Sequence, residues 1–259
     1  MNNRVFVHVP YRELQVNLAS ILAHRINPEL FFPAETLDSL IPEELHAHAD
    51  TLTANGLATT IHAPFMDLNP GSLEPLLRDA TRHRFRQVLD VAAILKPRVV
   101  VFHPGYDRWR YGGSQAAWLK HSIDSWRPVL ARAEEIGFIL AVENIFEEEP
   151  STLKILLEAL DSPSFRHCFD VGHWNLFHKV GMEEWFAELG HYIAEVHVHD
   201  NFGTKDDHAP IGEGNIDFDL YFRLMKEYAP DAVYTIEAHD RAAIFRAKER
   251  LEERLGNGL

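Results

Sequence analysis

Six apolar runs of this chain end in side chains that can bind a metal ion. The ends follow one another at steps of 27 or about 40 residues, a span that one strand, one crossover helix and their loops fill. If the strands are parallel and close into a barrel, their carboxyl ends meet on one face, where we expect a metal centre. The runs are LATTIH, RVVVFH, FILAVE, FRHCFD, YIAEVH and VYTIE, and their last residues are His62, His103, Glu143, Asp170, His197 and Glu237.

Four of these side chains form a hard, mostly oxygen donor set, which suits Mn²⁺, Mg²⁺, Co²⁺ or Zn²⁺. Three carboxylates at one barrel mouth would repel one another without a cation, so a metal explains why they occur together. The alternative is that each carboxylate pairs with an arginine or caps a helix. That alternative suits a single residue better than it suits a set of four, namely Glu143, Asp170, His197 and Glu237.

Two further groups of side chains are candidates for additional cations. His62 and His103 end neighbouring strands, each with a proline within two residues, and with Glu143 as a bridge they predict a second metal site. Hydrogen-bonded structural histidines are the alternative. A third site would use His173, in FDVGH, with Asp206 and His208 of the DDH motif, although this polar loop could equally face water.

The hydrophobic pattern predicts a single (β/α)₈ TIM barrel of the α/β class, one domain over residues 1–259, with its metal site at the carboxyl ends of the strands. The length matches the roughly 250 residues of such barrels, and runs such as VVVF suit strands buried on both faces. Predicted strands cover 4–9, 29–32, 57–62, 98–103, 138–143, 166–170, 192–197 and 232–237. Predicted helices cover 16–24, a segment from 42, 73–95, 114–136, 151–160, 182–189, 218–228 and 241–255.

Composition narrows the classes of partner. The net charge is −14 and lysine and arginine form no cluster, which disfavours nucleic acid without excluding it. No apolar run approaches the roughly 20 residues of a membrane helix. We expect a cytoplasmic protein, because MNNRVFVHVPYREL does not read as a secretory signal and Cys168 has no second cysteine to pair with. The sequence leaves the oligomeric state open.

The motifs HAPF, FHPG, AVEN, FDVGH, EVHVHDN and DDHAPIGEGNIDF together resemble the xylose-isomerase-like TIM-barrel superfamily. That superfamily contains sugar phosphate isomerases and epimerases, and also endonuclease IV, the AP endonuclease family 2 branch. The resemblance extends from about His62 to Glu237. It is specific to the superfamily and not to one reaction.

Each branch of this superfamily implies its own assignment of the site. The resemblance to endonuclease IV implies three zinc ions, held by His62, His103 and Glu143; by Glu143, Asp170, His197 and Glu237; and by His173, Asp206 and His208. The resemblance to the epimerases implies one metal on Glu143, Asp170, His197 and Glu237. There Glu143 and Glu237 would also be the catalytic acid and base, and His173 would touch the substrate.

Two reactions therefore remain open, with one to three divalent metals per chain. In the first, a metal chelates a small sugar or sugar phosphate and an enediolate forms as the two glutamates move a proton. In the second, three metals cleave a phosphodiester; three divalent ions among four carboxylates would leave positive charge for a phosphate. We favour the isomerase or epimerase, because the chain is acidic and most of the superfamily acts on sugars. A binding protein without turnover is a third class that no motif supports.

Several residues outside the ligand set complete these expectations. Arg108 and Trp109 follow the fourth strand and are candidates to grip a sugar ring or a phosphate. Asn144 and His199 could contact substrate oxygens. His46 and His48 are expected in solvent, Cys168 is expected in the core, and His8 and His239 are expected near the barrel mouth.

Overall fold

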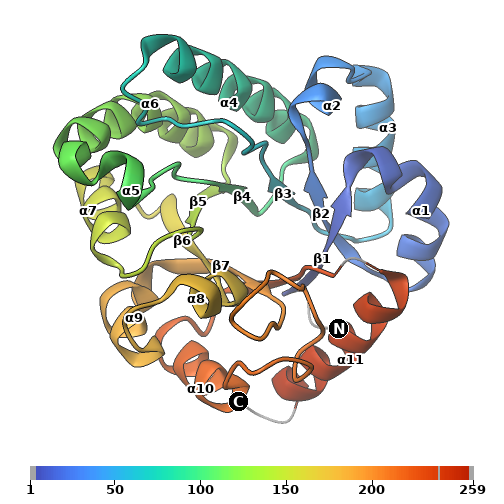
Figure 1. Cartoon of the computed structure of the whole chain (residues 1–259). Helices are drawn as coiled ribbons and strands as arrows, with labels where there is room; N and C mark the ends of the chain where they lie inside the picture. Colours follow the sequence, from blue (N-terminus) through green and yellow to red (C-terminus); the bar gives the residue numbers. More distant parts are fainter. Residues whose placement is uncertain (1–3, 239, 257–259) are drawn as a thin grey trace.

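Eight parallel strands close into a barrel in the order β1 to β8, and β8 pairs with β1 to complete it. The helices form a ring around this barrel (Figure 1). The computed structural model describes residues 4–238 and 240–256, so His239 lies outside the described residues. The predicted (β/α)₈ barrel is confirmed.

The strands lie close to their predicted positions. β3 is the shortest; in the chain before it, the Ala58 N–H donates to the side chain of Asn27 in β2 at 3.0 Å and not to a backbone carbonyl of that strand. The strands are β1 (Val5–Pro10), β2 (Asn27–Phe31), β3 (Thr60–His62), β4 (Val99–Phe102), β5 (Ile139–Glu143), β6 (Phe165–Asp170), β7 (Ile193–Val198) and β8 (Val233–Ile236).

All eight predicted helices are present, and three short ones lie between them. Two of the short helices begin at an aspartate whose carboxylate accepts a backbone N–H of the first turn, Asp107 for α5 and Asp170 for α8. The helices are α1 (Tyr11–Ala23), α2 (Ala34–Asp38), α3 (Pro42–Ala54), α4 (Pro75–Leu95), α5 (Arg108–Tyr111), α6 (Gln115–Ile136), α7 (Ser151–Leu160), α8 (Val171–Phe177), α9 (Met182–Leu189), α10 (Phe218–Tyr228) and α11 (Arg241–Gly256). None of the helices in the described ranges is long and apolar enough to cross a membrane.

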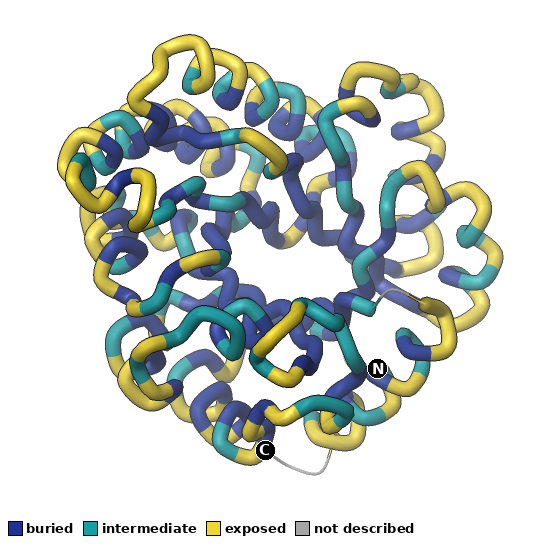
Figure 2. The backbone as a smooth tube through the Cα atoms, viewed as in Figure 1, coloured by how far each residue is buried: buried dark blue, intermediate teal, exposed yellow. Residues whose placement is uncertain are grey.

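The alternation of side chains along each strand divides the core in two. The larger apolar cluster fills the space between the barrel and its helices, and Figure 2 shows the buried strands inside a largely exposed outer ring. The smaller cluster occupies alternate strand positions and comprises Phe6, Val99, Val101, Ala141, Cys168 and Val233. In four cases the residue two positions later in the chain, whose side chain lies on the same side of the strand, is a metal-binding type. These residues are His8, His103, Glu143 and Asp170. A period of two therefore puts apolar side chains in the barrel and metal-binding types at its mouth.

The prediction that His48 is solvated is wrong. The side chain is buried between α1 and α3, where its two ring nitrogens lie 3.0 Å from the Tyr11 hydroxyl and 2.8 Å from the Gln15 amide oxygen. Leu45, His48 and Leu52 share the buried face of α3 at helical spacing. Hydrogen bonding by both ring nitrogens allows a histidine to occupy this face.

His167 of β6 gives the fold a testable dependence on pH. The ring is fully buried, its Nδ1–H donates to the Val142 carbonyl at 2.9 Å, and burial lowers its pKa to about 4. As the pH falls below about 6.5, His167 becomes protonated in the unfolded chain but stays neutral in the folded chain. The free energy of unfolding therefore decreases.

We expect His167 to account for about 2 kcal/mol of the loss in unfolding free energy between pH 7 and pH 5. Urea unfolding of the wild type and of His167→Gln at both pH values measures this. The loss should be smaller in His167→Gln, and equal losses in the two proteins would contradict the assignment.

Candidate metal centre and active site

The four residues predicted for the central metal meet at the Nδ1 atom of His197. This nitrogen lies 3.4 Å from Glu237 Oε1, 3.5 Å from Glu143 Oε2 and 3.8 Å from Asp170 Oδ2. It is buried and has no hydrogen-bond partner. The side chains come from the ends of β5, β6 and β7 and from the residue after β8. One ring nitrogen without a hydrogen bond thus has three carboxylate oxygens within 3.8 Å.

The carboxylate of Glu143 connects this group to three other histidines. Its Oε2 lies 3.2 Å from His62 Nε2 and 3.4 Å from His103 Nε2, while Oε1 lies 3.1 Å from His173 Nδ1. Burial alone would raise the pKa of Glu143, but the surrounding histidines, with His197 foremost, hold it well below its usual value. Glu143 is therefore an anion that faces several possible cation positions, as a bridging ligand would.

His62 is oriented by its own backbone neighbour. Its Nδ1 lies 2.9 Å from the Ala63 carbonyl, to which it donates, and this leaves Nε2 toward Glu143. Burial opposes the charged form of His62, but Glu143 raises its pKa to about 9. Phe65 stacks on the ring of His103 at 4.3 Å, and burial lowers the pKa of His103. The two histidines thus sit in different electrostatic environments although both face the same oxygen.

Asp206 gathers a second cluster of histidines at the outer side of the site. Its Oδ2 lies 2.9 Å from His208 Nε2 and 3.6 Å from His173 Nε2, and its Oδ1 lies 3.7 Å from His199 Nδ1. Burial is outweighed by the nearby carboxylates, which raise the pKa of His208 to about 9 and that of His173 to about 12. The predicted third group is therefore brought together, and His208 Nδ1 lies 3.6 Å from Glu237 of the central group.

The long loop after β7 that carries Asp206 and His208 is held by Asp200. The buried carboxylate of Asp200 accepts backbone N–H bonds from Gly212 and Gly214 at 2.9 and 2.8 Å, and also from Asn201 and Ile216. A β-carbon on Gly214 would lie 2.3 Å from the carboxylate, so this approach needs glycine. Figure 1 shows the loop, in orange, between β7 and α10.

Asp170 holds both a helix and a histidine. Its Oδ1 accepts the His173 N–H at 2.7 Å and caps α8, while Oδ2 lies 3.1 Å from His199 Nε2. The ring of His199 lies parallel to that of His208, with centroids 4.1 Å apart. A β-carbon on Gly172 would lie 2.0 Å from the ring of His199. The glycine of the FDVGH motif therefore makes room for His199.

A family model for the xylose isomerase-like TIM barrel matches residues 28–255. The chain belongs to the xylose isomerase-like TIM barrel family. The resemblance seen in the motifs is thereby confirmed, and the match covers the barrel from β2 into α11.

Two curated relatives match most of this chain. The uncharacterized protein MJ1311 of Methanocaldococcus jannaschii is 32% identical over 202 residues, which are 75% of this chain and 69% of the relative. A probable endonuclease 4 of Mycobacterium leprae is 25% identical over 196 residues, which are 70% of this chain and 74% of the relative.

Two solved structures share the whole fold. The crystal structure of a D-tagatose 3-epimerase-like protein is 27% identical with a TM-score of 0.84, and the match covers 98% of this chain and 97% of the other. The TTHB071 protein from Thermus thermophilus, soaked with ZnCl₂, is 23% identical with a TM-score of 0.81, and the match covers 99% of both chains. At that identity the second likeness is one of fold.

The predicted substrate-binding residues differ in whether their polar groups already bond to other residues of the chain. The amide of Asn144 is buried and bonds to both the N–H and the carbonyl of Asp170, at 2.9 and 2.8 Å, so it ties β5 to β6. Arg108 pairs with Glu148 at 2.8 Å and covers the ring of Trp109, which is 83% exposed. His173 and His199 lie within the site itself.

Sequence reasoning missed three buried glutamates near this site, Glu29, Glu147 and Glu195, of which Glu195 lies within 4.8 Å of Glu29 and His197. Glu29 of β2 is fully buried and bonds to both His8 and His197. Its neighbour in the register is His8, so strand pairing was the signal that could have found it. Glu147 accepts the Ile145 N–H at 2.7 Å, and burial raises its pKa to about 7.

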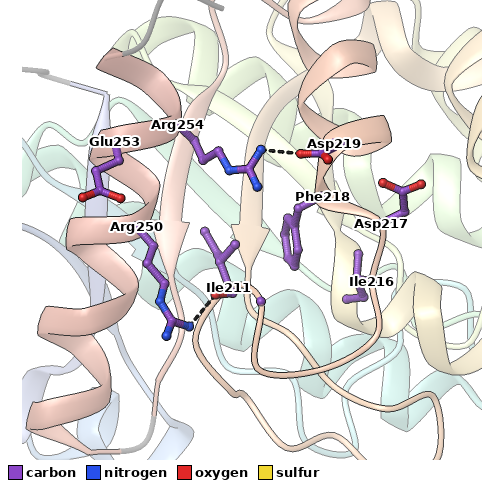
Figure 3. Close-up of a pocket in the computed structure, with 9 residues that line it drawn as sticks. Ile211, Ile216, Asp217, Phe218, Asp219, Arg250, Glu253 and Arg254 are labelled. Carbon is purple, nitrogen blue, oxygen red and sulfur yellow. Dashed lines mark hydrogen bonds and ion pairs between the residues drawn. The ribbon is translucent and has the colours of Figure 1, made fainter.

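A pocket of about 390 Å³ lies elsewhere, between α10 and α11 (Figure 3). Its arginines are engaged, because Arg254 pairs with Asp219 and Arg250 donates to the Ile211 carbonyl. None of the predicted metal ligands lines this pocket. The candidate active site is therefore the barrel mouth and not this pocket.

The contact between Gly172 and His199 gives a prediction about packing. We expect Gly172→Ala to lose about 1–3 kcal/mol of unfolding free energy, because the added methyl group must displace the ring or the backbone. Gly113→Ala is the control, since a β-carbon there meets nothing within 4 Å. Urea unfolding measures both, and a similar loss in the two variants would refute the packing argument.

Proposed function

We propose that this chain is a divalent-metal-dependent enzyme that isomerises or epimerises a small sugar or sugar phosphate through an enediolate. We also propose that residues 1–259 form one domain. The observation that carries the proposal is the buried Nδ1 of His197, which has no partner and faces the carboxylates of Glu143, Asp170 and Glu237.

The donor set fits a divalent cation. A buried nitrogen that faces carboxylate oxygens at 3.4–3.8 Å without a hydrogen bond leaves a position where a cation satisfies all of them. Three carboxylates and an imidazole suit Mn²⁺, Mg²⁺, Co²⁺ or Zn²⁺. Such an ion, when bound, polarises adjacent oxygens of the sugar and stabilises the negative charge of the enediolate.

Glu143 and Glu237 are the proposed acid and base. One carboxylate takes the proton from the carbon beside the carbonyl, and the electrons of that C–H bond move into the enediolate. The other carboxyl group returns a proton to complete the isomerisation or epimerisation. The low pKa of Glu143 means that it is in the ionised, proton-accepting form.

The substrate would be positioned by residues that follow β4, β6 and β7. His173 and His199 lie beside Asp170 and can donate to sugar hydroxyl groups. Trp109 is exposed and could stack on a sugar ring with the face that Arg108 does not cover, and Arg108 could leave Glu148 to bind a phosphate. Asn144 would act chiefly by holding Asp170.

Two findings support a sugar as substrate. The chain carries a net charge of −14, which does not favour a large polyanionic partner. The relative of known structure with 27% identity is described as D-tagatose 3-epimerase-like. The family itself includes more than one chemistry, so the reaction is assigned from the site.

The alternative is a trinuclear zinc phosphodiesterase. It is favoured by the cluster of His173, Asp206 and His208, which an isomerase does not need, and by the relative described as a probable endonuclease 4. Three divalent ions among the carboxylates would leave net positive charge for a phosphate. Its ligands would be His62, His103, Glu143, Asp170, His173, His197, Asp206, His208 and Glu237.

The metal content of protein purified without chelator separates the two functions. We expect about one manganese, magnesium or cobalt per chain by elemental mass spectrometry, because one cation satisfies the central group. Glu237→Gln should lose at least about a hundredfold in turnover of ketoses or ketose phosphates, whereas the exposed control Glu227→Gln should not. Three zinc ions per chain would favour the phosphodiesterase. Normal activity of Glu237→Gln would contradict the assignment of the barrel mouth as the active site.

The outer cluster provides a second discriminating test. Asp206→Ala combined with His208→Ala should leave sugar turnover largely intact, because neither residue belongs to the central group, and should abolish any phosphodiester cleavage. Asp207→Ala, in the same loop and paired with Lys205, is the matched control. Collapse of sugar turnover in the double variant, with the control active, would count against the isomerase.

A further inference from the structure

Glu29 connects two sides of the barrel interior beneath the site. It is fully buried in β2, and its Oε1 accepts from His197 Nε2 of β7 at 3.2 Å. Its Oε2 accepts from His8 Nδ1 of β1 at 2.9 Å. β2 and β7 are not neighbours in the barrel, so this carboxylate spans its interior.

We propose that Glu29 is a positioning residue that holds His197 in the orientation and tautomer needed to bind the central metal through Nδ1. The inference rests on the proposed function, because it assigns a role toward the metal proposed there. In this role Glu29 would act on the metal only through His197 and would not be a ligand itself.

The two ring nitrogens of His197 have different partners, and this fixes the tautomer. A neutral imidazole carries one N–H, and a hydrogen bond from Nε2 to Glu29 places that N–H on Nε2. Nδ1 then presents its lone pair, and it is this atom that faces Glu143, Asp170 and Glu237 without a hydrogen bond. A carboxylate behind a ligating histidine also makes the ring a stronger ligand.

Histidines on both sides keep Glu29 in its acceptor form. Each of its two carboxylate oxygens faces a ring nitrogen, Oε1 that of His197 and Oε2 that of His8. His8 also lies 3.5 Å from Glu237 Oε1. The chain of contacts therefore runs from His197 through Glu29 and His8 to Glu237, and it links two of the proposed metal ligands.

The test is the affinity of the full chain for Mn²⁺, measured by calorimetric titration. Glu29→Gln should bind Mn²⁺ roughly 10- to 100-fold more weakly, which is the usual effect of removing such a supporting carboxylate. Glu29→Asp keeps the charge on a shorter side chain, so its affinity should lie between those of Glu29→Gln and the wild type. It also serves if Glu29→Gln fails to fold.

Glu195→Gln is the matched control. Glu195 is also buried inside the barrel, but its Oε1 accepts from the Thr235 hydroxyl and not from His197. Burial raises its pKa to about 8, so an amide resembles its neutral form. We expect the affinity of this variant to stay within about threefold of the wild type.

Nitrogen NMR of the histidine rings in metal-free protein separates positioning from a general structural effect, provided that the pH is high enough for the His197 ring to be neutral, because the nearby carboxylates raise its pKa. The wild type should show His197 with its proton on Nε2, and Glu29→Gln should show a mixture of tautomers. Wild-type affinity in Glu29→Gln, or an equal loss in Glu195→Gln, overturns the proposal. If the wild type binds no Mn²⁺, the proposed function fails, and an unchanged His197 tautomer in Glu29→Gln would still overturn the positioning role.

Discussion

The mouth of this barrel has to accommodate several buried carboxylates that repel one another. Glu29, Glu143, Asp170 and Glu237 all lie in or beside one small volume and are at most 8% exposed. Desolvation disfavours each negative charge, so the arrangement is possible only where positive charge is interleaved. Every one of these carboxylates faces at least two histidines.

The balance between buried carboxylates and positive charge relates the fold to the proposed metal chemistry. Without metal, protons on the histidines supply the positive charge, which is why the pKa values of His62 and His173 rise to about 9 and about 12. Under the proposed function a bound cation replaces part of that charge, and metal uptake is then coupled to proton release. Asp170 extends the coupling to the backbone, because the carboxylate that faces His197 also caps α8.

The sequence alone predicted what local periodicity determines. Apolar runs that end in metal-binding residues predicted the barrel and the face on which those residues meet. The alternation of side chains along a strand accounts for which of them point inward. Glu29 and Gly172 were missed because each acts on a residue of another strand or loop, and Asp200 was missed because its partners are backbone amides more than ten residues further along the same loop. His48 was misjudged because its polarity was weighed without its place on the buried face of α3. Such contacts depend on how elements are brought together, which one linear sequence does not reveal.

The anchoring of the loop by Asp200 has a consequence for how such a barrel can diversify. One buried carboxylate gathers four backbone amides from residues 201–216, so the loop closes on itself. The segment between its anchor points, which includes exposed Phe202 and Lys205, can change length or composition while the strands keep their register. The loop could therefore be replaced as a unit. A grafted loop that retains Asp200, Gly212 and Gly214 would bring a new set of side chains to an unchanged barrel mouth.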